Sequence, residues 1–209
     1  MKATAQLPGF YNDLALSFEK AWDVIEPGAT KRTSPAHTPV VGTTDEDGKV
    51  QLRVMVLRHA NRKTRLLRFH TDIRSTKIAE IGGGCAASVL MYDPLEKLQI
   101  RLSGIISVAF DGAEADSAWR DSTTFARRCY LAEAAPGSIT EHATSGLPGW
   151  IEGKQPAEED LVEARANFAI LWFEVYSLEF LYLANAGHRR AKWEWDEDTG
   201  LWPGRWLVP

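Results

Sequence analysis

The sequence predicts a mainly β protein, an antiparallel sheet that closes into a barrel and carries helical inserts. Short apolar stretches of strand character follow one another through tight turns, such as the Asp-Gly turn of DEDG at 45–48. Helical spacing of apolar residues is confined to a few segments. No internal repeat or low-complexity linker divides the chain, so we expect one domain over residues 1–209.

The elements are expected in the following order along the chain. Residues 1–27 are expected to form a helical arm, in which Pro8 and Gly9 interrupt the short segment before the helix. A helix over 75–81 is expected to end at the glycines 82–84, because glycine closes helices without steric cost. Strands are expected at 39–44, 49–58, 64–71, 85–93, 97–110 and 170–184, followed by a final hairpin over 188–209 that turns at DEDTG.

A helical insert and loop are expected over 111–168, between the strands. Helical spacing runs from 113 to 130, with a break near 122–124, and a further helix is expected over 157–167. Between them, 136–157 is rich in turn chemistry (PGS, TSGLPG, GKQP). We interpret this segment as an ordered excursion over the site or a mobile lid.

Composition excludes several classes of protein. The chain has 44% apolar and 25% charged residues, a net charge of −4 and no apolar run long enough to span a bilayer. The mild acidity argues against a general nucleic-acid binder, which needs a broad basic face. Cys85 and Cys129 lack disulfide or metal-site spacing, so we expect a cytoplasmic protein without a metal site.

The segment from Arg53 to Lys77 is strongly basic, with eight Lys and Arg residues against one acid, Asp72. Ser75 can cap the helix after it, and Arg74 and Lys77 add charge beside the free N–H groups of the first turn. Such an arrangement binds phosphate. From spacing alone, a solvated and Ser-capped surface helix is an equal alternative.

Other polar residues are ambiguous by themselves. Arg53 and Arg58 are five apart, so they face opposite sides of a regular strand unless a bulge or strand end intervenes. Gln99 and Arg101 share a strand face, and Gln99 is either an edge residue or a ligand for a planar polar group. His70 is by itself an ordinary polar residue. The tryptophans of the final hairpin are interpreted mainly as structural.

No signature of a serine hydrolase, zincin, P-loop or Rossmann protein is present. Four segments taken in order do carry a resemblance: RVMVLR (53–58), FHTDIRSTK (69–77), LQIRLSG (98–104) and HRRAKW…WPGRWLVP (188–209). Together they resemble the pyridoxamine 5′-phosphate oxidase family of FMN-binding split β-barrels, from about residue 30 to the end. The resemblance implies an antiparallel split β-barrel of the FMN-binding type.

The resemblance also implies a set of cofactor contacts. Arg53 and Lys77 would hold the FMN phosphate with Ser75 and Thr76 nearby, and Arg58 would approach the pyrimidine side of the isoalloxazine. His70 and Thr71 would add contacts from the strand end. Gln99 would reach the flavin from the partner subunit of a homodimer, with FMN at the subunit interface. The full set implied to bind the cofactor is Arg53, Val54, Met55, Val56, Arg58, His70, Thr71, Arg74, Ser75, Thr76, Lys77, Gln99 and Arg190.

Departures from the family pattern put the substrate in doubt. Thr76-Lys77 stands where the family has Arg-Lys, a loss that Arg74 could replace. Ala186-Gly187-His188 stands where the oxidases carry R-L-H, so His188 is the one candidate substrate contact, and no general base is assigned. The element that grips the substrate phosphate in the oxidases has no clean equivalent.

The resemblance thus predicts an FMN-dependent oxidoreductase with an altered substrate pocket and an unknown small-molecule substrate. Two alternatives stay open. One is a flavin-binding or storage module without turnover, and the other is a split barrel that uses a deazaflavin or haem. The remaining cations of the basic stretch, Arg62, Lys63, Arg65 and Arg68, are interpreted as surface charge.

Overall fold

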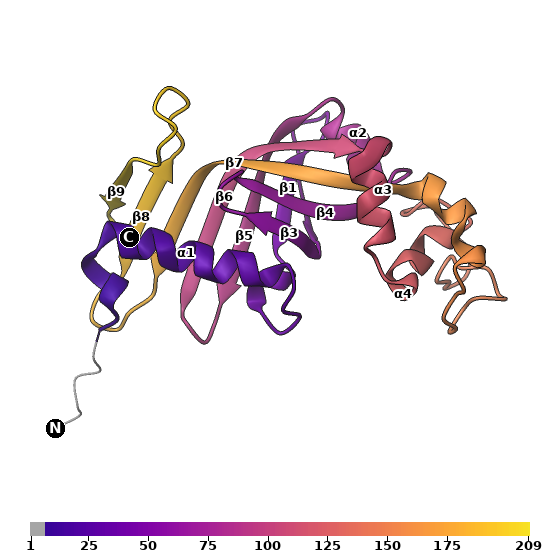
Figure 1. Cartoon of the computed structure of the whole chain (residues 1–209), viewed down its shortest axis with the longest axis horizontal. Coiled ribbons are helices and arrows are strands. Elements are labelled where there is room, and N and C mark those ends of the chain that lie inside the picture. Colours follow the sequence, from indigo (N-terminus) through magenta and orange to yellow (C-terminus); the bar gives the residue numbers. More distant parts are fainter. Residues whose placement is uncertain (1–6) are drawn as a thin grey trace. The chain divides into compact units, whose positions relative to one another are not determined.

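The computed structural model describes residues 7–209, so the first six residues of the expected N-terminal arm lie outside the described part of the chain. Within it, nine strands form an antiparallel sheet in the order β2-β1-β5-β6-β7-β4-β3, and β8 pairs with β7 and with β9 (Figure 1). The prediction of a mainly β, antiparallel split-barrel fold is confirmed. The chain divides into two compact units, which we describe separately.

The first unit consists of Met1–Arg68, Ala86–Ile105 and Phe173–Pro209. Its described part begins with the short 3-10 helix η1 (Gly9–Asn12), followed by α1 (Leu14–Gly28) and η2 (Pro35–His37). Asp13 caps α1 by accepting from the Leu16 N–H at 2.9 Å, and the helix buries Trp22 and Ile25. The helix expected to end near residue 27 thus ends at Gly28.

The first hairpin pairs β1 (Val40–Thr44) with β2 (Val50–Val54), and Asp45 accepts the backbone N–H of Lys49 at 2.8 Å within its turn. The single strand expected over 49–58 is wrong. The chain leaves the strand at Met55 and Val56 and resumes as β3 (Leu57–Asn61). Arg53 and Arg58 therefore belong to different strands.

Three later strands are long and lie partly in each unit: β5 (Cys85–Asp93), β6 (Leu98–Ala109) and β7 (Phe168–Tyr182). The chain ends in a hairpin of two short strands, β8 (Arg189–Glu194) and β9 (Gly204–Leu207). At Gly104 in β6, a Cβ would lie 1.8 Å from the Glu174 carbonyl oxygen of β7, so only glycine allows this close approach.

The second unit consists of Phe69–Cys85 and Ile106–Trp172. It contains most of β4 (Leu66–Asp72), then α2 (Thr76–Ile81), α3 (Gly112–Arg120), α4 (Thr124–Arg127) and η3 (Arg128–Leu131). The expected helix over 113–130 is indeed broken, by Asp121–Thr123, near the predicted position. The expected helix over 157–167 instead forms two 3-10 turns, η4 (Glu159–Leu161) and η5 (Glu163–Asn167).

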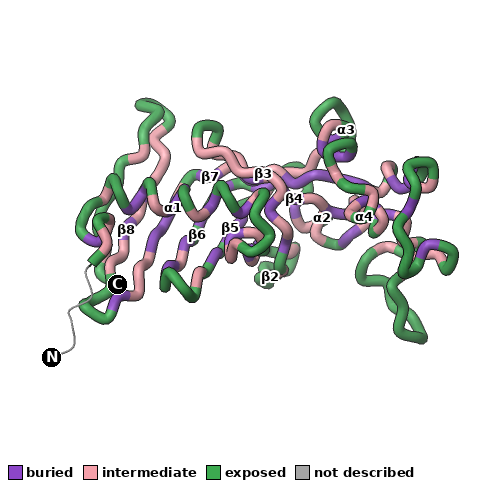
Figure 2. The backbone as a smooth tube through the Cα atoms, turned by 60° about the horizontal axis from the view of Figure 1, so that its bottom comes forward, coloured by how far each residue is buried: buried purple, intermediate pink, exposed green. Residues whose placement is uncertain are grey.

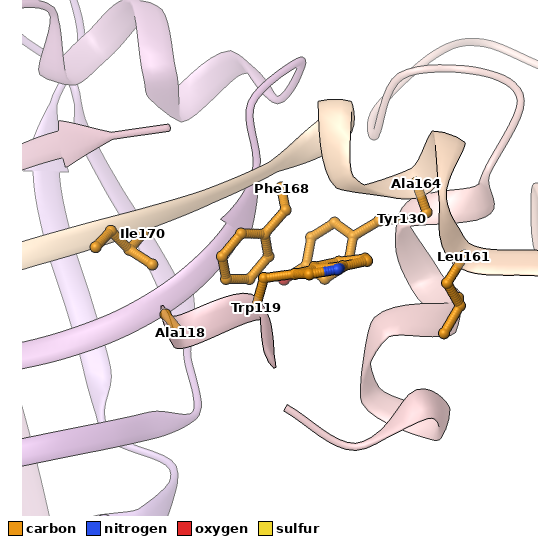
Figure 3. Packing of buried hydrophobic residues seen from close by; sticks show 7 residues of the cluster. All are labelled: Ala118, Trp119, Tyr130, Leu161, Ala164, Phe168 and Ile170. Atoms are coloured by element: carbon orange, nitrogen blue, oxygen red, sulfur yellow. The ribbon is translucent and has the colours of Figure 1, made fainter. Parts of the chain in front are cut away.

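An aromatic cluster is the core of this unit (Figure 3). Phe168 is fully buried and meets Trp119 and Tyr130 edge-on, at centroid distances of 5.3 and 5.1 Å. Arg127 lies over Trp119 and pairs with Glu158 at 2.6 Å. These contacts connect the first helices of the insert to the segment just before η4. By contrast, residues 136–145 are exposed and carry no helix or strand, as Figure 2 shows for the looped part of this insert.

None of the helices within residues 7–209 combines the length and the apolar character that crossing a membrane requires.

Candidate functional site

Three residues of the second unit form a hydroxyl cluster: Thr71 at the end of β4, Ser75 before α2, and Lys77 in its first turn. The Lys77 ammonium donates to the Ser75 hydroxyl at 2.9 Å and to the Thr71 hydroxyl at 3.2 Å. Thr71 and Ser75 are each about 5% exposed, and Lys77 is half-buried. Hydroxyl groups and an ammonium in one place are donors of the kind that a phosphate requires.

Ser75 does not cap α2, contrary to the expectation from sequence. It occupies the N-cap position, but its hydroxyl donates to the Asp72 carbonyl oxygen at 2.7 Å instead of accepting from the helix. The helix itself has only six residues. The Ser75 hydroxyl thus belongs to the hydroxyl cluster and does not cap the first turn of α2.

Arg74 lies beside this cluster but has partners of its own. Its Nη2 lies 2.7 Å from Asp72 Oδ2 and its Nε 3.0 Å from Asp72 Oδ1, and Nη2 also donates to the Ala132 carbonyl at 2.9 Å. The hydrogen bond with Asp72 raises the pKa of Arg74 above its usual value. Arg74 thus neutralises Asp72 and connects the segment before α2 to the backbone at Ala132 by a hydrogen bond. Its predicted phosphate contact stays a prediction.

The other site residues of this unit are His70 and Thr76. The His70 ring meets the Phe168 ring edge-on at 4.9 Å, which joins the end of β4 to the aromatic cluster. Thr76 is exposed.

The arginines expected to contact the cofactor from the first unit have different surroundings. Arg53 lies opposite Val41 in the β1–β2 register, on the buried side of the hairpin, and donates to the hydroxyl of the buried Thr43. Arg58 is half-buried in β3, and its Nε is buried without a hydrogen-bond partner among the described residues. Between them Val54 is exposed and Met55 is buried.

A third group, which we call the Glu179 cluster, consists of Arg101 in β6, Glu179 in β7 and Arg190 in β8. The Glu179 side chain is 7% exposed and accepts hydrogen bonds from Arg101 Nη2 at 2.6 Å and from Arg190 Nε at 3.1 Å. Gln99 lies two residues before Arg101 and therefore on the same face of β6. Sequence reasoning missed Glu179, although an acid within an otherwise apolar strand was a usable signal.

Arg65, which the sequence suggested to be surface charge, is a structural residue. Its side chain is 12% exposed, pairs with Glu174 at 2.7 Å, and lies 4.1 Å from the centroid of the Trp195 ring. Arg62 pairs with Glu19, whereas Lys63 is exposed as expected. Trp193 is buried against Phe18, in line with the structural role expected for the tryptophans.

One face of the sheet in the first unit is apolar and exposed. Val50, Leu52 and Val54 alternate along β2 and are 70, 69 and 65% exposed, and Figure 2 shows the exposure of this strand. The register places Val54 opposite Val40 and Val40 opposite Leu90, so these three residues form one row across β2, β1 and β5. Small residues beside the row leave a hollow of about 360 Å³, lined in part by Gly42, Ala86 and Ser103. We call this surface the apolar sheet face.

His188 lies in the wall of a larger cavity of about 460 Å³. Its lining also includes Asn12, Arg189 and Trp206. Arg189 lies over the Tyr11 ring at 4.0 Å and donates to Asn12 Oδ1 at 2.8 Å. The cavity has the size of a small-molecule site.

Comparison with known proteins agrees with the resemblance seen in the sequence. Residues 19–109 match the model of the pyridoxamine 5′-phosphate oxidase FMN-binding domain. No match is found among curated protein sequences.

Three solved structures illustrate the similarity of fold. A pyridoxamine 5′-phosphate oxidase-related FMN-binding protein from Nostoc punctiforme is 20% identical at a TM-score of 0.68, over 98% of this chain and all of the other. PhzG from Burkholderia lata, solved with tetrahydrophenazine-1-carboxylic acid, is 20% identical with the same TM-score, over 99% of each chain. A protein from Clostridium acetobutylicum related to general stress protein 26 is 12% identical, with a TM-score of 0.54 over 90% of this chain and 98% of its own.

These matches confirm the family resemblance and the split-barrel fold. The matched domain is an FMN-binding domain, which supports flavin binding by this chain.

Proposed function

We propose that this chain, whose residues 19–109 match the pyridoxamine 5′-phosphate oxidase FMN-binding domain, is an FMN-dependent oxidoreductase with a substrate pocket of its own. The observation that carries the proposal is the hydroxyl cluster, which lies in the segment that the resemblance assigns to the FMN phosphate. The cluster places an ammonium and two hydroxyl groups within 3.3 Å of one another in a largely buried setting.

The residues present fit a flavin phosphate. Lys77 supplies a charge-assisted donor, and the hydroxyl groups of Thr71 and Ser75 can turn their protons toward an oxyanion. Arg74 removes the opposing charge of Asp72 through a two-point ion pair. In the proposed complex Thr76 and His70 line the phosphate end, and Arg53 stays a predicted phosphate contact that the resemblance implies.

Arg58 is proposed to stabilise the ring end of the cofactor. Its buried and unpartnered Nε is the kind of donor that a ligand acceptor satisfies. Bound FMN would supply two-electron redox chemistry through its isoalloxazine ring. A cation held near the pyrimidine side of that ring favours its reduced, anionic form, and this is the role that we propose for Arg58.

We further propose that the protein works as a homodimer whose apolar sheet face is the subunit interface. Val50, Leu52 and Val54 form an exposed ridge next to a hollow lined by small residues, which is a self-complementary arrangement for two copies related by a twofold axis. Gln99 extends from β6 on the same side of the sheet. In the proposed dimer Gln99 of one subunit reaches the flavin of the other, as the resemblance implies, and Arg190 lies near the same flavin.

The substrate is proposed to differ from that of the vitamin oxidases. Ala186 and Gly187 stand where the family pattern has Arg-Leu, so His188 alone remains as a candidate substrate contact. PhzG, which shares this fold at 20% identity, was solved with a phenazine carboxylic acid. Other chemistries are therefore compatible with the same scaffold.

The test of the proposed function is the identity and the reactivity of the bound ligand. We expect the purified protein to absorb in the flavin region, and mass spectrometry of the released ligand to give the mass of FMN. Release of a deazaflavin or haem, or failure to bind added FMN, would contradict the proposal. A flavin-loaded protein that neither forms hydrogen peroxide with candidate substrates nor accepts electrons from nicotinamide nucleotides would instead be a storage module.

A further inference from the structure

Glu179 is a buried carboxylate in an otherwise largely apolar strand. Burying an apolar side chain at this position would carry no desolvation penalty of this kind. Its side chain is 7% exposed, whereas those of Arg101 and Arg190 are 48 and 31% exposed. Removing a carboxylate from water is unfavourable unless its oxygens are paired and hydrogen-bonded. Oε1 accepts a hydrogen bond from Arg190 Nε at 3.1 Å and lies 3.0 Å from Arg190 Nη2 in an ion pair, and Oε2 accepts from Arg101 Nη2 at 2.6 Å. Both oxygens are therefore occupied by guanidinium groups.

These contacts fix the direction of both arginines. A guanidinium is a planar fork, so two contacts from one edge of Arg190 to one oxygen set the orientation of its plane. Nη1 of Arg190 makes no hydrogen bond with the described residues and is left for another acceptor. The three charged groups sum to one positive charge, and the two arginines carry the exposed surface of the cluster.

We propose that Glu179 is a positioning residue for the flavin site, which holds Arg190 and Arg101 together in the orientation that contacts the isoalloxazine ring. The inference rests on the proposed function, in which Arg190 contacts FMN. It adds that Arg101, two residues beyond Gln99 on the same strand face, is a second contact. It also adds that both arginines depend on one buried carboxylate.

The substitution Glu179→Gln distinguishes positioning from simple electrostatics, because the two predict opposite changes in FMN affinity. Glu179→Gln removes a negative charge, so the surroundings of an anionic cofactor become more positive, and electrostatics alone would tighten FMN binding. The glutamine amide has only one acceptor oxygen, so it can accept from one of the two arginines. Its NH₂ group, a donor, then faces the guanidinium of the other arginine. If Glu179 acts by positioning, Glu179→Gln weakens FMN binding, by about tenfold for one lost charge-assisted contact.

The experiment measures the dissociation constants of FMN and riboflavin for the full chain by flavin fluorescence. Glu194→Gln is the matched control, because Glu194 in β8 also bridges two cations, Lys192 and Arg205, but is 43% exposed and touches no proposed ligand contact. We expect Glu179→Gln to weaken FMN and riboflavin about equally, since the ring and not the phosphate is concerned. We expect Glu194→Gln to change neither by more than about twofold.

A double-mutant cycle separates positioning from a structural role. Arg190→Gln should weaken flavin about as much as Glu179→Gln, and the double variant should be little worse than Arg190→Gln alone, because the two side chains act as one unit. The visible absorption spectrum of the bound flavin should change in the same way in both single variants. A purely structural Glu179 would instead lower the melting temperature and leave this spectrum unchanged.

If Glu179→Gln does not fold, Glu179→Asp tests the positioning role instead. This variant keeps the negative charge but moves the carboxylate away from the arginines by one methylene group. Weaker flavin binding by Glu179→Asp supports positioning, and unchanged binding overturns it. Tighter or unchanged FMN binding by folded Glu179→Gln also overturns the inference while leaving the proposed function intact. A wild-type protein that binds no flavin rejects the proposed function itself.

Discussion

Lys77 and Arg190 are both cations of the candidate site, but Lys77 is held by two neutral hydroxyl groups and Arg190 by a buried carboxylate. The hydroxyl cluster comes from seven consecutive residues, Thr71 to Lys77. The Glu179 cluster instead joins Arg101 to Glu179 across 78 residues of sequence. The two hydroxyl groups surround the Lys77 ammonium with groups that can both donate and accept, whereas the buried Glu179 carboxylate orients the Arg190 guanidinium. We infer that the first cluster supplies affinity for the phosphate and the second supplies orientation at the ring.

Of the changes considered, disruption of the proposed dimer should reduce flavin binding the most. Leu52→Asp places a charge in the centre of the apolar sheet face, where burial of an unpaired carboxylate is unfavourable. We expect sedimentation velocity to show a dimer for the wild type and a monomer for this variant. The monomer would keep its hydroxyl cluster but lose the contacts that the partner's Gln99 and Arg190 are proposed to make.

Leu95→Asp is the control for this substitution, because Leu95 is 91% exposed in the turn between β5 and β6, outside the apolar sheet face. It should remain a dimer. A monomeric wild type, or a dimeric Leu52→Asp, would move the interface to another surface.

A smaller effect is expected when the hydroxyl cluster loses one hydroxyl group. Ser75→Ala removes the hydrogen bond to the Asp72 carbonyl and one of the two oxygens that hold Lys77. FMN affinity should fall about five- to tenfold and the free energy of unfolding by about 1 kcal/mol. Thr64→Ala, at an exposed threonine in the turn between β3 and β4, should change neither quantity. Equal losses for FMN and riboflavin would show that Ser75 does not contact the phosphate.

Arg74→Gln tests whether this arginine binds phosphate or only fastens the loop. Because the Asp72 ion pair and the Ala132 hydrogen bond occupy its guanidinium, we expect unfolding to become easier by about 1 kcal/mol. FMN affinity should fall by less than about threefold. A loss as large as that of a Lys77 variant would instead assign Arg74 to the phosphate.

The weakest effect concerns Glu194, the exposed counterpart of Glu179. Its hydrogen bond with Lys192 lowers the pKa of Glu194 in the folded protein below the value in the unfolded chain. Its contribution to stability is therefore present above an unfolded pKa of about 4.3 and is lost as the pH falls through the folded value. The difference in unfolding free energy between wild type and Glu194→Gln should shrink between about pH 5 and pH 3, as followed by urea unfolding. A difference that stays constant over this range would show that the ion pair does not stabilise the fold.

Structural features that depend on residues close together in the sequence were predicted better than features that depend on residues far apart. The turn at Asp45, the helix stop at Gly82 and the hairpin at 188–209 are local, and all three are present. Ser75 and Lys77 of the hydroxyl cluster were singled out from local sequence, whereas Thr71 entered only through the family resemblance and the predicted capping by Ser75 is wrong.

Features that arise from pairing between distant strands were not predicted. The pattern of alternation in KVQLRVMVLR continues through Met55 and Val56, and nothing local marks the break that separates Arg53 from Arg58. The partners of Glu179 come from strands β6 and β8, so its burial and its two ion pairs follow from register alone. Ser75 was misjudged for a different and local reason, because the Asp72 carbonyl three residues earlier accepts its hydroxyl proton.

The role of the hydroxyl cluster in binding phosphate can be measured as the ratio of FMN to riboflavin affinity in the wild type and in Lys77→Ala, with the exposed Lys63→Ala as control. The two ligands differ only in the phosphate, so the ratio isolates the contribution of this cluster. We expect the wild type and Lys63→Ala to prefer FMN strongly, and Lys77→Ala to lose about ten- to hundredfold of that preference while binding riboflavin normally. A folded Lys77→Ala protein that prefers FMN as strongly as the wild type would contradict a phosphate site at Lys77.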